Sequence, residues 1–298
     1  MFNLRHILGS TWAIETQIAL LPFYQLNDRD IILLDTGFAS SDRQALTETL
    51  KAHDFHVKGI LCSHAHMDHA GNIRHLCGIY GCRVAAHLIE AAIAATPDSF
   101  RRHYGIYNSD DQGGVEECFT TTDIIMPGQQ QLDFCGASFG ILHLPGHSGG
   151  HIGIVTPDRV AYLGDVLMGF PQLETSKMPT TQFLARDLES KRSLYSLRAQ
   201  AYIVAHKAVF TDIHELIGAN LHCLETKIRQ VLEALRGTPT RGEWLLTFCE
   251  NQHIHVRSDR SFAIMEYGFN SIVTYLEETG QVRSRRVNGN RRYKRCLK

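Results

Sequence analysis

The sequence predicts an α/β fold over residues 1–210, followed by a small, mainly helical unit. Strand-like and helix-like stretches alternate along the first part of the chain, which is typical of α/β proteins. Hydrophobic residues make up 44% and charged residues 20% of the 298 residues, so the chain can bury a sizeable core. This composition excludes a mainly disordered chain, a coiled coil and a small disulfide-stapled scaffold.

The chain begins with a predicted β-meander. Asn27-Asp28 has the character of a hairpin turn, and the apolar run Ile31–Leu34 predicts a buried strand that leaves through Asp35-Thr36-Gly37. The stretches that follow predict a helix over 41–52, a strand over 57–62, a helix over 67–80, a strand over 83–86 and a helix over 88–95. Pro97 ends the last of these helices.

Residues 97–120 are interpreted as a mobile insertion or lid, because they contain Gly113-Gly114 and many polar residues. Regular structure is expected to resume beyond them. The predicted elements are strands over 138–144, 151–155 and 159–163, a helix over 181–199 and a strand over 201–205.

The C-terminal part reads as three helices and a hairpin. One long helix is predicted over 211–236, and Gly237-Thr238-Pro239 ends it; two helical stretches follow near 242–250 and 265–278. Asn288-Gly289 is a strong type I′ turn signal within a basic segment, which predicts a basic β-hairpin over 281–295. This order is that of a winged-helix domain, so we expect an α/β domain over 1–215 and a winged-helix-like domain over 216–298.

Charge is divided unevenly between the two parts, although the formal net charge is only −1. Residues 221–298 carry 14 Lys/Arg against 8 Asp/Glu, a net of +6, whereas residues 1–220 carry 16 against 23, a net of −7. The total argues against a nucleic-acid coat, and the split suggests modules with different partners, although two surfaces that merely differ in charge explain it equally well.

Cysteine spacing and the N-terminus predict a cytoplasmic protein. The eight cysteines form no C-x-x-C pair, and most are expected to be small core residues; Cys77 and Cys82 are expected to pack rather than to do redox work. The apolar run Ile18–Phe23 is too short for a membrane span and lacks the layout of a signal peptide.

The most informative segment is His64-Ala65-His66-Met67-Asp68-His69. Four candidate metal ligands lie within six residues, between a predicted strand and a predicted helix. Imidazole and carboxylate ligands together suit zinc, iron or manganese. A solvated polar turn is the alternative, but this ligand pattern is improbable by chance.

Three more candidate ligands follow apolar β-runs farther along the chain. His147 follows Pro145-Gly146, Asp165 follows Tyr162-Leu163-Gly164, and His206 ends the run Tyr202–Ala205. Each residue alone is most simply an ordinary polar residue. Because all three follow strands, they are expected to emerge at one edge of stacked sheets.

In these motifs, and in the strand-end Asp35, the chain resembles the metallo-β-lactamase superfamily in its glyoxalase II-like hydrolase branch, over residues 10–215. The resemblance implies a four-layer αβ/βα sandwich with two metals in a cleft at one edge. It implies that His64, His66 and His147 hold the first metal, that Asp68, His69 and His206 hold the second, that Asp165 bridges them, and that Asp35 orients a ligand.

One motif departs from the family pattern. Family members commonly have Pro-Gly-His-Gly at the last histidine, whereas this chain has Val204-Ala205-His206-Lys207 and so leaves Lys207 beside the site. His214 is the alternative ligand, though it lies in a helical stretch. His151 is expected to be a core histidine rather than a contact of the site, and Met168-Gly169-Phe170 is a candidate lining of the substrate cleft.

The resemblance implies a hydrolase that uses a metal-bridging hydroxide on a small carbonyl substrate, a thioester, ester or lactone. Asp68 is expected to orient the hydroxide and pass a proton to the leaving group. Zinc is the expected metal, with iron and manganese as alternatives.

A metal-dependent single-strand endoribonuclease that holds RNA on the basic hairpin is the second hypothesis, and a nucleic-acid-binding protein with a vestigial metal site is the third. A homodimer is the default oligomeric state, and no membrane contact is expected.

Overall fold

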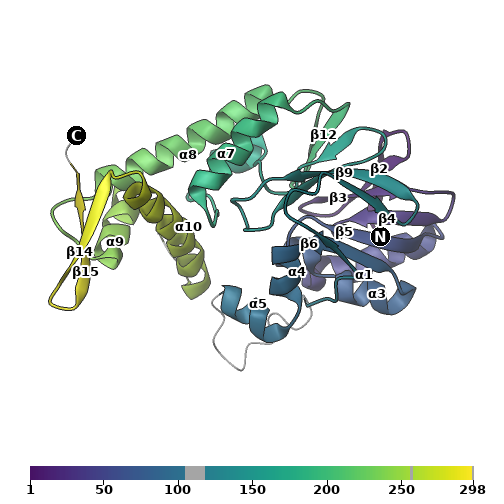
Figure 1. Ribbon diagram of the computed structural model, residues 1–298, viewed down its shortest axis with the longest axis horizontal. Coiled ribbons are helices and arrows are strands. Elements are labelled where there is room, and N and C mark those ends of the chain that lie inside the picture. Colours follow the sequence, from purple (N-terminus) through teal and green to yellow (C-terminus); the bar gives the residue numbers. More distant parts are fainter. Residues whose placement is uncertain (105–117, 256–257, 297–298) are drawn as a thin grey trace.

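The computed structural model describes residues 1–104, 118–255 and 258–296. Two mixed β-sheets face each other, helices cover both outer surfaces, and a helical unit with a hairpin extends away from the N-terminal meander (Figure 1). The predicted αβ/βα sandwich is therefore confirmed.

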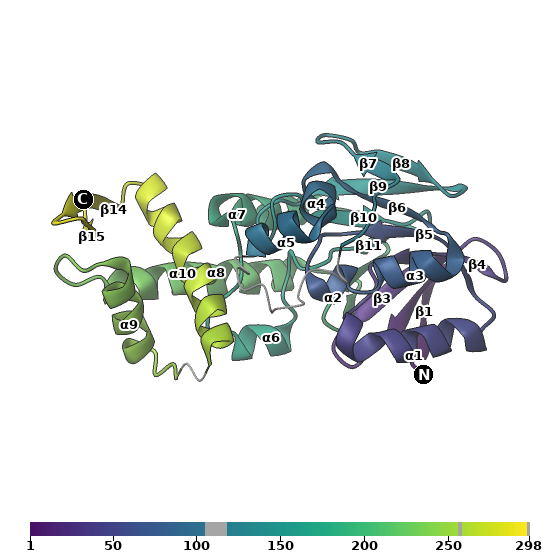
Figure 2. The same ribbon diagram turned by 90° about the horizontal axis from the view of Figure 1, so that it is seen from below.

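The first sheet has seven strands in chain order. Its members are β1 (Asn3–Leu8), β2 (Thr11–Glu15), β3 (Leu20–Gln25), β4 (Asp30–Leu34), β5 (His56–Cys62), β6 (Arg83–His87) and β7 (Asp123–Ile125). The first four strands form the predicted antiparallel meander, and β4 to β7 run parallel. The outer helices are α1 (Ala39–Ala52), α2 (Met67–Ala70), α3 (Ile73–Tyr80), α4 (Leu88–Ala94) and α5 (Pro97–Tyr104) (Figure 2).

The second sheet has six strands in the order β13-β12-β11-β10-β9-β8. Their bounds are β8 (Gln131–Phe134), β9 (Ala137–His143), β10 (Ile152–Val155), β11 (Val160–Tyr162), β12 (Ala201–Val204) and β13 (Ala208–Phe210). The β11–β12 pair is parallel, and the other pairs are antiparallel. Strands β9, β11 and β12 therefore point in one direction and end at one edge.

The apolar strand runs are continuous because both faces of each sheet are buried. On β4, Ile31 and Leu33 pack under the helices, whereas Ile32 and Leu34 pack between the sheets. On β12, Ala201 and Ile203 face the other sheet, whereas Tyr202 and Val204 face the outer helices. A strand with two buried faces shows no polar alternation, which is why these segments read as unbroken apolar runs.

The C-terminal part contains the predicted helices and hairpin. They are α8 (His214–Ala234), α9 (Arg241–Asn251), α10 (Asp259–Glu278), β14 (Val282–Val287) and β15 (Asn290–Arg295). Trp244, Phe248, Phe269 and Tyr293 form a core of their own with α7 (Leu184–Ser193). Helix α8 contributes to two cores, with Leu216 and Ile217 against the sandwich and Leu224 and Val231 in this second core. The winged-helix assignment and the boundary at 215/216 stay predictions.

Several local expectations differ from the structure. Pro97 ends α4 as expected but also begins α5, because proline is well suited to the first turn of a helix; residues 105–117 of the expected lid lie outside the described residues. The helix expected over 181–199 is shorter, namely α7 followed by a 3₁₀ turn over Leu194–Ser196. Strands β7, β8 and β13 and helix α6 (Phe170–Thr175) were not predicted, because each has only three to six residues.

Two further observations bear on the sequence expectations. The eight cysteines are thiols rather than disulfides: Cys62, Cys82, Cys118 and Cys249 are buried, and the other four are partly buried. Within the described part of the chain, no helix has the length and apolar character needed to cross a membrane.

Candidate metal centre

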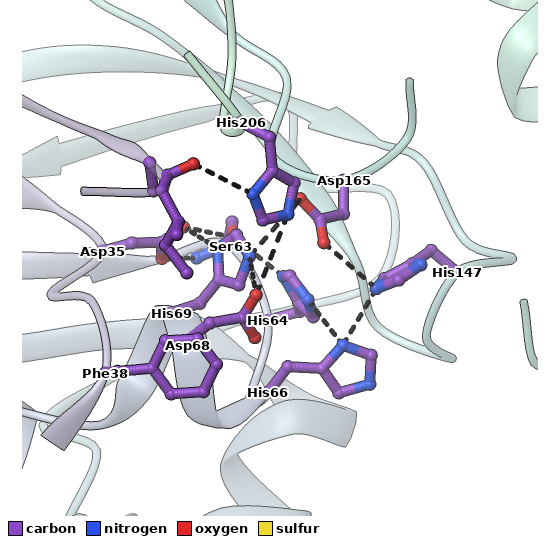
Figure 3. A network of polar contacts seen from close by, with 12 residues as sticks. Asp35, Phe38, Ser63, His64, His66, Asp68, His69, His147, Asp165 and His206 are labelled. Carbon is purple, nitrogen blue, oxygen red and sulfur yellow. Dashed lines mark hydrogen bonds and ion pairs between the residues drawn. The ribbon is translucent and has the colours of Figure 1, made fainter. Parts of the chain in front are cut away.

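The sequence-predicted ligands converge at the edge of the sandwich where parallel strands end (Figure 3). Strand β4 ends before Asp35, β5 ends before His64, and β11 and β12 end before Asp165 and His206. Their potential ligand atoms fall into two groups, and within each group the atoms lie within 4.8 Å of one another. The first group is His64, His66 and His147, and the second is Asp68, His69, Asp165 and His206.

The first group consists of three nitrogen atoms that face one another. His66 Nδ1 lies 2.9 Å from His64 Nε2 and 2.9 Å from His147 Nε2. His147 Nδ1 lies 3.0 Å from the carbonyl oxygen of Thr180, which can only accept, so the ring proton of His147 resides on Nδ1. The Nε2 lone pair of His147 therefore points into the group.

The proton of His64 is fixed in the same way. Ser63 Oγ donates to Asp35 Oδ2 at 2.6 Å and lies 3.0 Å from His64 Nδ1, so Nδ1 carries the hydrogen that the hydroxyl oxygen accepts. Nε2 of His64 and Nε2 of His147 therefore both direct a lone pair at His66 Nδ1, which can donate at most one hydrogen. Converging imidazole lone pairs of this kind fit a cation such as zinc.

The second group combines two histidines with two carboxylates. His69 Nε2 lies 3.6 Å from Asp68 Oδ2 and 3.4 Å from Asp165 Oδ1, and His206 Nε2 lies 3.8 Å and 3.5 Å from the same two atoms. Among the described residues, His69 Nε2 and Asp165 Oδ1 are buried without a hydrogen-bond partner. Because His69 Nδ1 faces Asp35, Nε2 presents a lone pair, and two unpartnered buried lone-pair atoms at one point fit a bound cation.

Asp165 lies between the two groups. Its Oδ2 is 3.6 Å from His147 Nε2 in the first group, and its Oδ1 faces His69 and His206 in the second. One carboxylate oxygen is thus directed to each group, which is the placement expected of a bridging ligand.

The two groups differ in their electrostatics. Burial, together with the neighbouring imidazoles, holds the pKa values of His64 and His147 well below the usual range, so these rings are neutral. In the second group, burial opposes a charge on His69, but the surrounding carboxylates, first Asp165 and then Asp68, raise its pKa well above the usual value. The second group therefore strongly favours a positive charge.

Asp35 accepts four hydrogen bonds beside the two groups, one of them from His69 of the second group. Its fully buried carboxylate accepts from Ser63 N at 2.7 Å, Ser63 Oγ at 2.6 Å, Tyr162 Oη at 2.6 Å and His69 Nδ1 at 2.7 Å. The bond to His69 leaves Nε2 of that ring directed at Asp68 and Asp165. Asp35 is thus placed to orient a ligand, as the resemblance implied.

His206, and not His214, lies within the second group of potential ligand atoms. His214 begins α8, is half exposed and lies 2.9 Å from Asp212, outside both groups. Lys207, which stands where the family has glycine, adopts φ of 65°, the left-handed conformation that glycine adopts most easily. Lys207 therefore holds a backbone conformation that glycine would adopt with less strain.

Some supporting residues were not identified from the sequence. Tyr162 and Ser63 bind Asp35, and Glu90 binds backbone beside the first group. Glu90 stands among the buried apolar residues of α4, and an acidic residue within such an apolar stretch indicates a buried carboxylate. His151 is buried, as expected, but its Nε2 also accepts from the backbone N–H of Asp165 at 3.0 Å, and burial lowers its pKa to about 3.

A cavity of about 190 Å³ adjoins the two groups. His147, Asp165 and His206 line one side of it, and Leu167, Met168, Pro179, Asn220 and Leu224 are among the residues that line the rest. Of the expected lining segment, Met168 takes part, whereas Gly169 and Phe170 do not border this cavity.

Comparisons with known proteins agree with this geometry. The sequence profile of the metallo-beta-lactamase superfamily matches residues 23–210. An atrochrysone carboxyl ACP thioesterase of Passalora fulva is 26% identical over 74% of this chain and 58% of its own length. A hydroxyacylglutathione hydrolase of Haemophilus influenzae is 27% identical over 47% of this chain and 63% of its own. The chain thus spans less than two thirds of these relatives.

Solved structures show the same fold. A metallo-beta-lactamase family protein of Thermus thermophilus superposes with a TM-score of 0.70 at 22% identity, covering 93% of this chain and 94% of that protein. A beta-lactamase domain protein of Burkholderia ambifaria superposes with a TM-score of 0.73 at 16% identity, covering 99% of this chain and 94% of its own. The second match includes the C-terminal helices and hairpin.

Proposed function

Because the chain belongs to the metallo-beta-lactamase superfamily, we propose that it is a metal-dependent hydrolase that cleaves thioesters of small acyl groups. The observation that carries this proposal is the pair of facing donor groups, which share Asp165 and open on one cavity. The relatives named as thioesterase and hydroxyacylglutathione hydrolase support the thioester over the ester and lactone alternatives.

The donor sets define where cations would be held. His64, His66 and His147 would hold one, Asp68, His69 and His206 the other, with Asp165 shared between them. Zinc is the proposed metal, because imidazole and carboxylate are its usual ligands in catalytic sites. Such cations supply an acidified water at neutral pH and neutralise the negative charge that develops on the substrate oxygen.

Asp68 is the residue best placed to move a proton. Its carboxylate is 21% exposed, more than that of Asp165 at 13%, so it reaches both the cations' position and the solvent-facing side of the site. We assign to Asp68 the acceptance of a proton from the attacking water and its delivery to the leaving sulfur.

The cavity sets the size of the acyl group. A cavity of about 150 Å³ accommodates benzene, so 190 Å³ suits a group of roughly six to eight heavy atoms. Leu167, Met168 and Leu224 line it together with polar residues that include Thr181, Asp187 and Lys191. A short acyl chain or a single ring is therefore the expected acyl part.

A substrate panel tests the proposal. Protein reconstituted with zinc is given thioesters of increasing acyl size, together with the matching oxoesters and lactones. Hydrolysis of all three classes is followed by the release of acid, and that of the thioesters also by loss of thioester absorbance. We expect the highest kcat/KM for short-chain thioesters. His66→Ala is expected to abolish hydrolysis, and His214→Ala, which changes an exposed histidine outside the site, is expected to retain it. Absence of thioester hydrolysis in zinc-loaded wild type would refute the proposal.

One observation favours the endoribonuclease as a second candidate. The hairpin register places Arg283 opposite Lys294 and Arg285 opposite Arg292, and Arg292 also lies 3.5 Å from Glu243 Oε2. Like charges that face each other across strands destabilise a hairpin, and the phosphates of a nucleic acid would offset that repulsion. Cleavage of 5′-labelled single-stranded RNA that is lost both in His66→Ala and in the double variant R283E/R285E would favour this candidate; RNA left intact by the metal-loaded protein would exclude it.

A further inference from the structure

Glu90 is a fully buried carboxylate that lies between the two loops that carry the three-histidine group. It stands in the first turn of α4 and is 0% exposed. Oε2 accepts the backbone N–H of Ala65 at 2.9 Å, and Oε1 accepts Ser148 Oγ at 2.7 Å and the backbone N–H of Gly150 at 2.8 Å. A buried carboxylate is costly unless hydrogen bonds or a cation compensate for its lost hydration.

Each of these bonds ends close to a proposed metal ligand. Ala65 is the residue between His64 and His66, so its N–H belongs to the segment that joins the two ligands. Ser148 directly follows His147. One side chain therefore fixes the spacing between two loops that are more than 80 residues apart in the sequence and that together supply all three histidines.

The backbone approaches so closely here that glycine is needed at position 150. A Cβ atom on Gly150 would lie 2.4 Å from His87 Nδ1 and 3.0 Å from Glu90 Oε1. Real Cβ atoms essentially never approach a neighbour within 3.0 Å. The loop after His147 thus packs directly on α4 and its carboxylate.

We propose that Glu90 is a positioning residue for the three-histidine group, and that it raises the cation affinity of that group selectively. The inference rests on the proposed function only in that the three histidines bind a cation. The first group contains no carboxylate apart from the shared Asp165, so the buried charge of Glu90 supplies part of the counter-charge for a divalent cation there. Asp35 bonds His69 of the second group directly, and it reaches His64 of the first group only through Ser63.

The matched pair Glu90→Gln and Asp35→Asn tests the selectivity. In Glu90→Gln the new amide would keep one acceptor oxygen, but it would turn an NH₂ group toward an N–H or O–H donor and would remove the charge. Changes to residues that orient metal ligands typically reduce metal affinity about 10–100-fold. We therefore expect Glu90→Gln to weaken the three-histidine group by about that factor and the second group little. Asp35→Asn should weaken chiefly the second group, because Asp35 bonds His69 directly and reaches His64 only through Ser63.

The two groups can be measured separately with Co²⁺ as the probe. A His206→Ala background disables the second group, and a His66→Ala background disables the first. Each matched variant is combined with each background and titrated with Co²⁺ against a chelator, with the visible absorption bands reporting the coordination. Gly150→Ala, which displaces the same loop without removing the charge, is expected to weaken the three-histidine group in the His206→Ala background.

Thermal melting of the cation-free variants separates positioning from folding. A purely structural role would lower the melting temperature and weaken both groups alike. Should Glu90→Gln be too unstable to purify, Ser148→Ala removes one of the three donors and should show a smaller loss confined to the first group. Equal loss at both groups, no loss, or no Co²⁺ binding in the His206→Ala background would overturn the inference. Intact Co²⁺ binding without thioester hydrolysis would instead count against the proposed substrate alone.

Discussion

At the scale of single residues, the metal centre depends on side chains that bind no metal themselves. Asp35 accepts four hydrogen bonds in a fully buried place, and two of them come from the side chains of Ser63 and Tyr162. Burial, together with the Asp35 carboxylate, raises the pKa of Tyr162 well above its usual value, so the hydroxyl stays protonated and donates. Tyr162 and Ser63 therefore help to orient the His69 ring through the Asp35 carboxylate that all three contact.

Tyr162→Phe is expected to lower the free energy of unfolding by about 1.5–3 kcal/mol, because it removes a hydrogen bond to a buried charged group. Tyr202→Phe is the matched control. Tyr202 lies on the neighbouring strand, and its hydroxyl bonds to the uncharged backbone of Leu197 and Ala199, so a loss of about 0.5–1.5 kcal/mol is expected. Urea unfolding of both variants measures the difference. An equal loss in the two would show that the Asp35 contact has no special weight.

Asp68→Asn is expected to lower kcat about 10²–10⁴-fold, which is the usual contribution of a residue that transfers a proton. The amide keeps one oxygen toward the second group but cannot accept the proton. Steady-state kinetics on the best thioester, with metal content determined for each preparation, provide the test. Asp212→Asn, an exposed carboxylate paired with His214, is the control. A kcat close to that of the wild type in metal-loaded Asp68→Asn would remove Asp68 from the proposed mechanism.

At the scale of elements, the C-terminal helix α10 touches the loop that orients His147. Ser271 Oγ donates to the carbonyl of Gln182 at 3.3 Å, and Gly268 lies against Met178 and Pro179. The same loop carries the Thr180 carbonyl that accepts from His147 Nδ1. The helical unit therefore reaches the metal centre through one short loop.

Gly268→Ala should disturb the site from a distance, because the added Cβ would lie 2.6 Å from both Met178 Cγ and the Pro179 carbonyl oxygen. Overpacking of this kind costs about 1–3 kcal/mol, and the shifted loop should also lower the Co²⁺ affinity of the three-histidine group. Gly242→Ala, in α9, is the matched control: no described atom lies within 4 Å of its added Cβ, so the change should be neutral or stabilising by up to about 1 kcal/mol. Indistinguishable melting curves for the two variants would contradict this packing.

At the scale of the whole molecule, two cores share one helix. The sandwich core and the C-terminal core both include residues of α8, and α7 packs with the C-terminal helices. Figure 1 shows α8 running between the sheets and the hairpin. The positive charge of residues 221–298 thus lies largely on the part that extends away from the N-terminal meander.

Cation binding should therefore stabilise the chain as one unit. A ligand that binds only the folded state adds about 2.7 kcal/mol at roughly 100 times its dissociation constant. We expect a single thermal transition that rises when zinc is added and falls when a chelator removes it, with His66→Ala showing a smaller rise. Two transitions of which only one responds to zinc would show that the C-terminal core unfolds independently.

The positions of the main strands could be predicted from the apolar runs, because such runs report strands that are buried on both faces. The αβ/βα sandwich was implied by the resemblance of the ligand motifs to the family. The convergence of the ligands could be predicted as well, since Asp35, His64, Asp165 and His206 each follow such a run and parallel strands end at one edge.

How these residues are held in place depends on tertiary contacts that the sequence does not reveal. Tyr162 and Asp35 are 127 residues apart, and Glu90 and Gly150 are 60 apart, so no local spacing records their contacts. Helix α5 and the short strands β7, β8 and β13 depend on packing against longer neighbours rather than on their own periodicity. The same holds for α8, whose single helical pattern gives no sign that it belongs to two cores, because periodicity identifies a buried face but not the element that covers it.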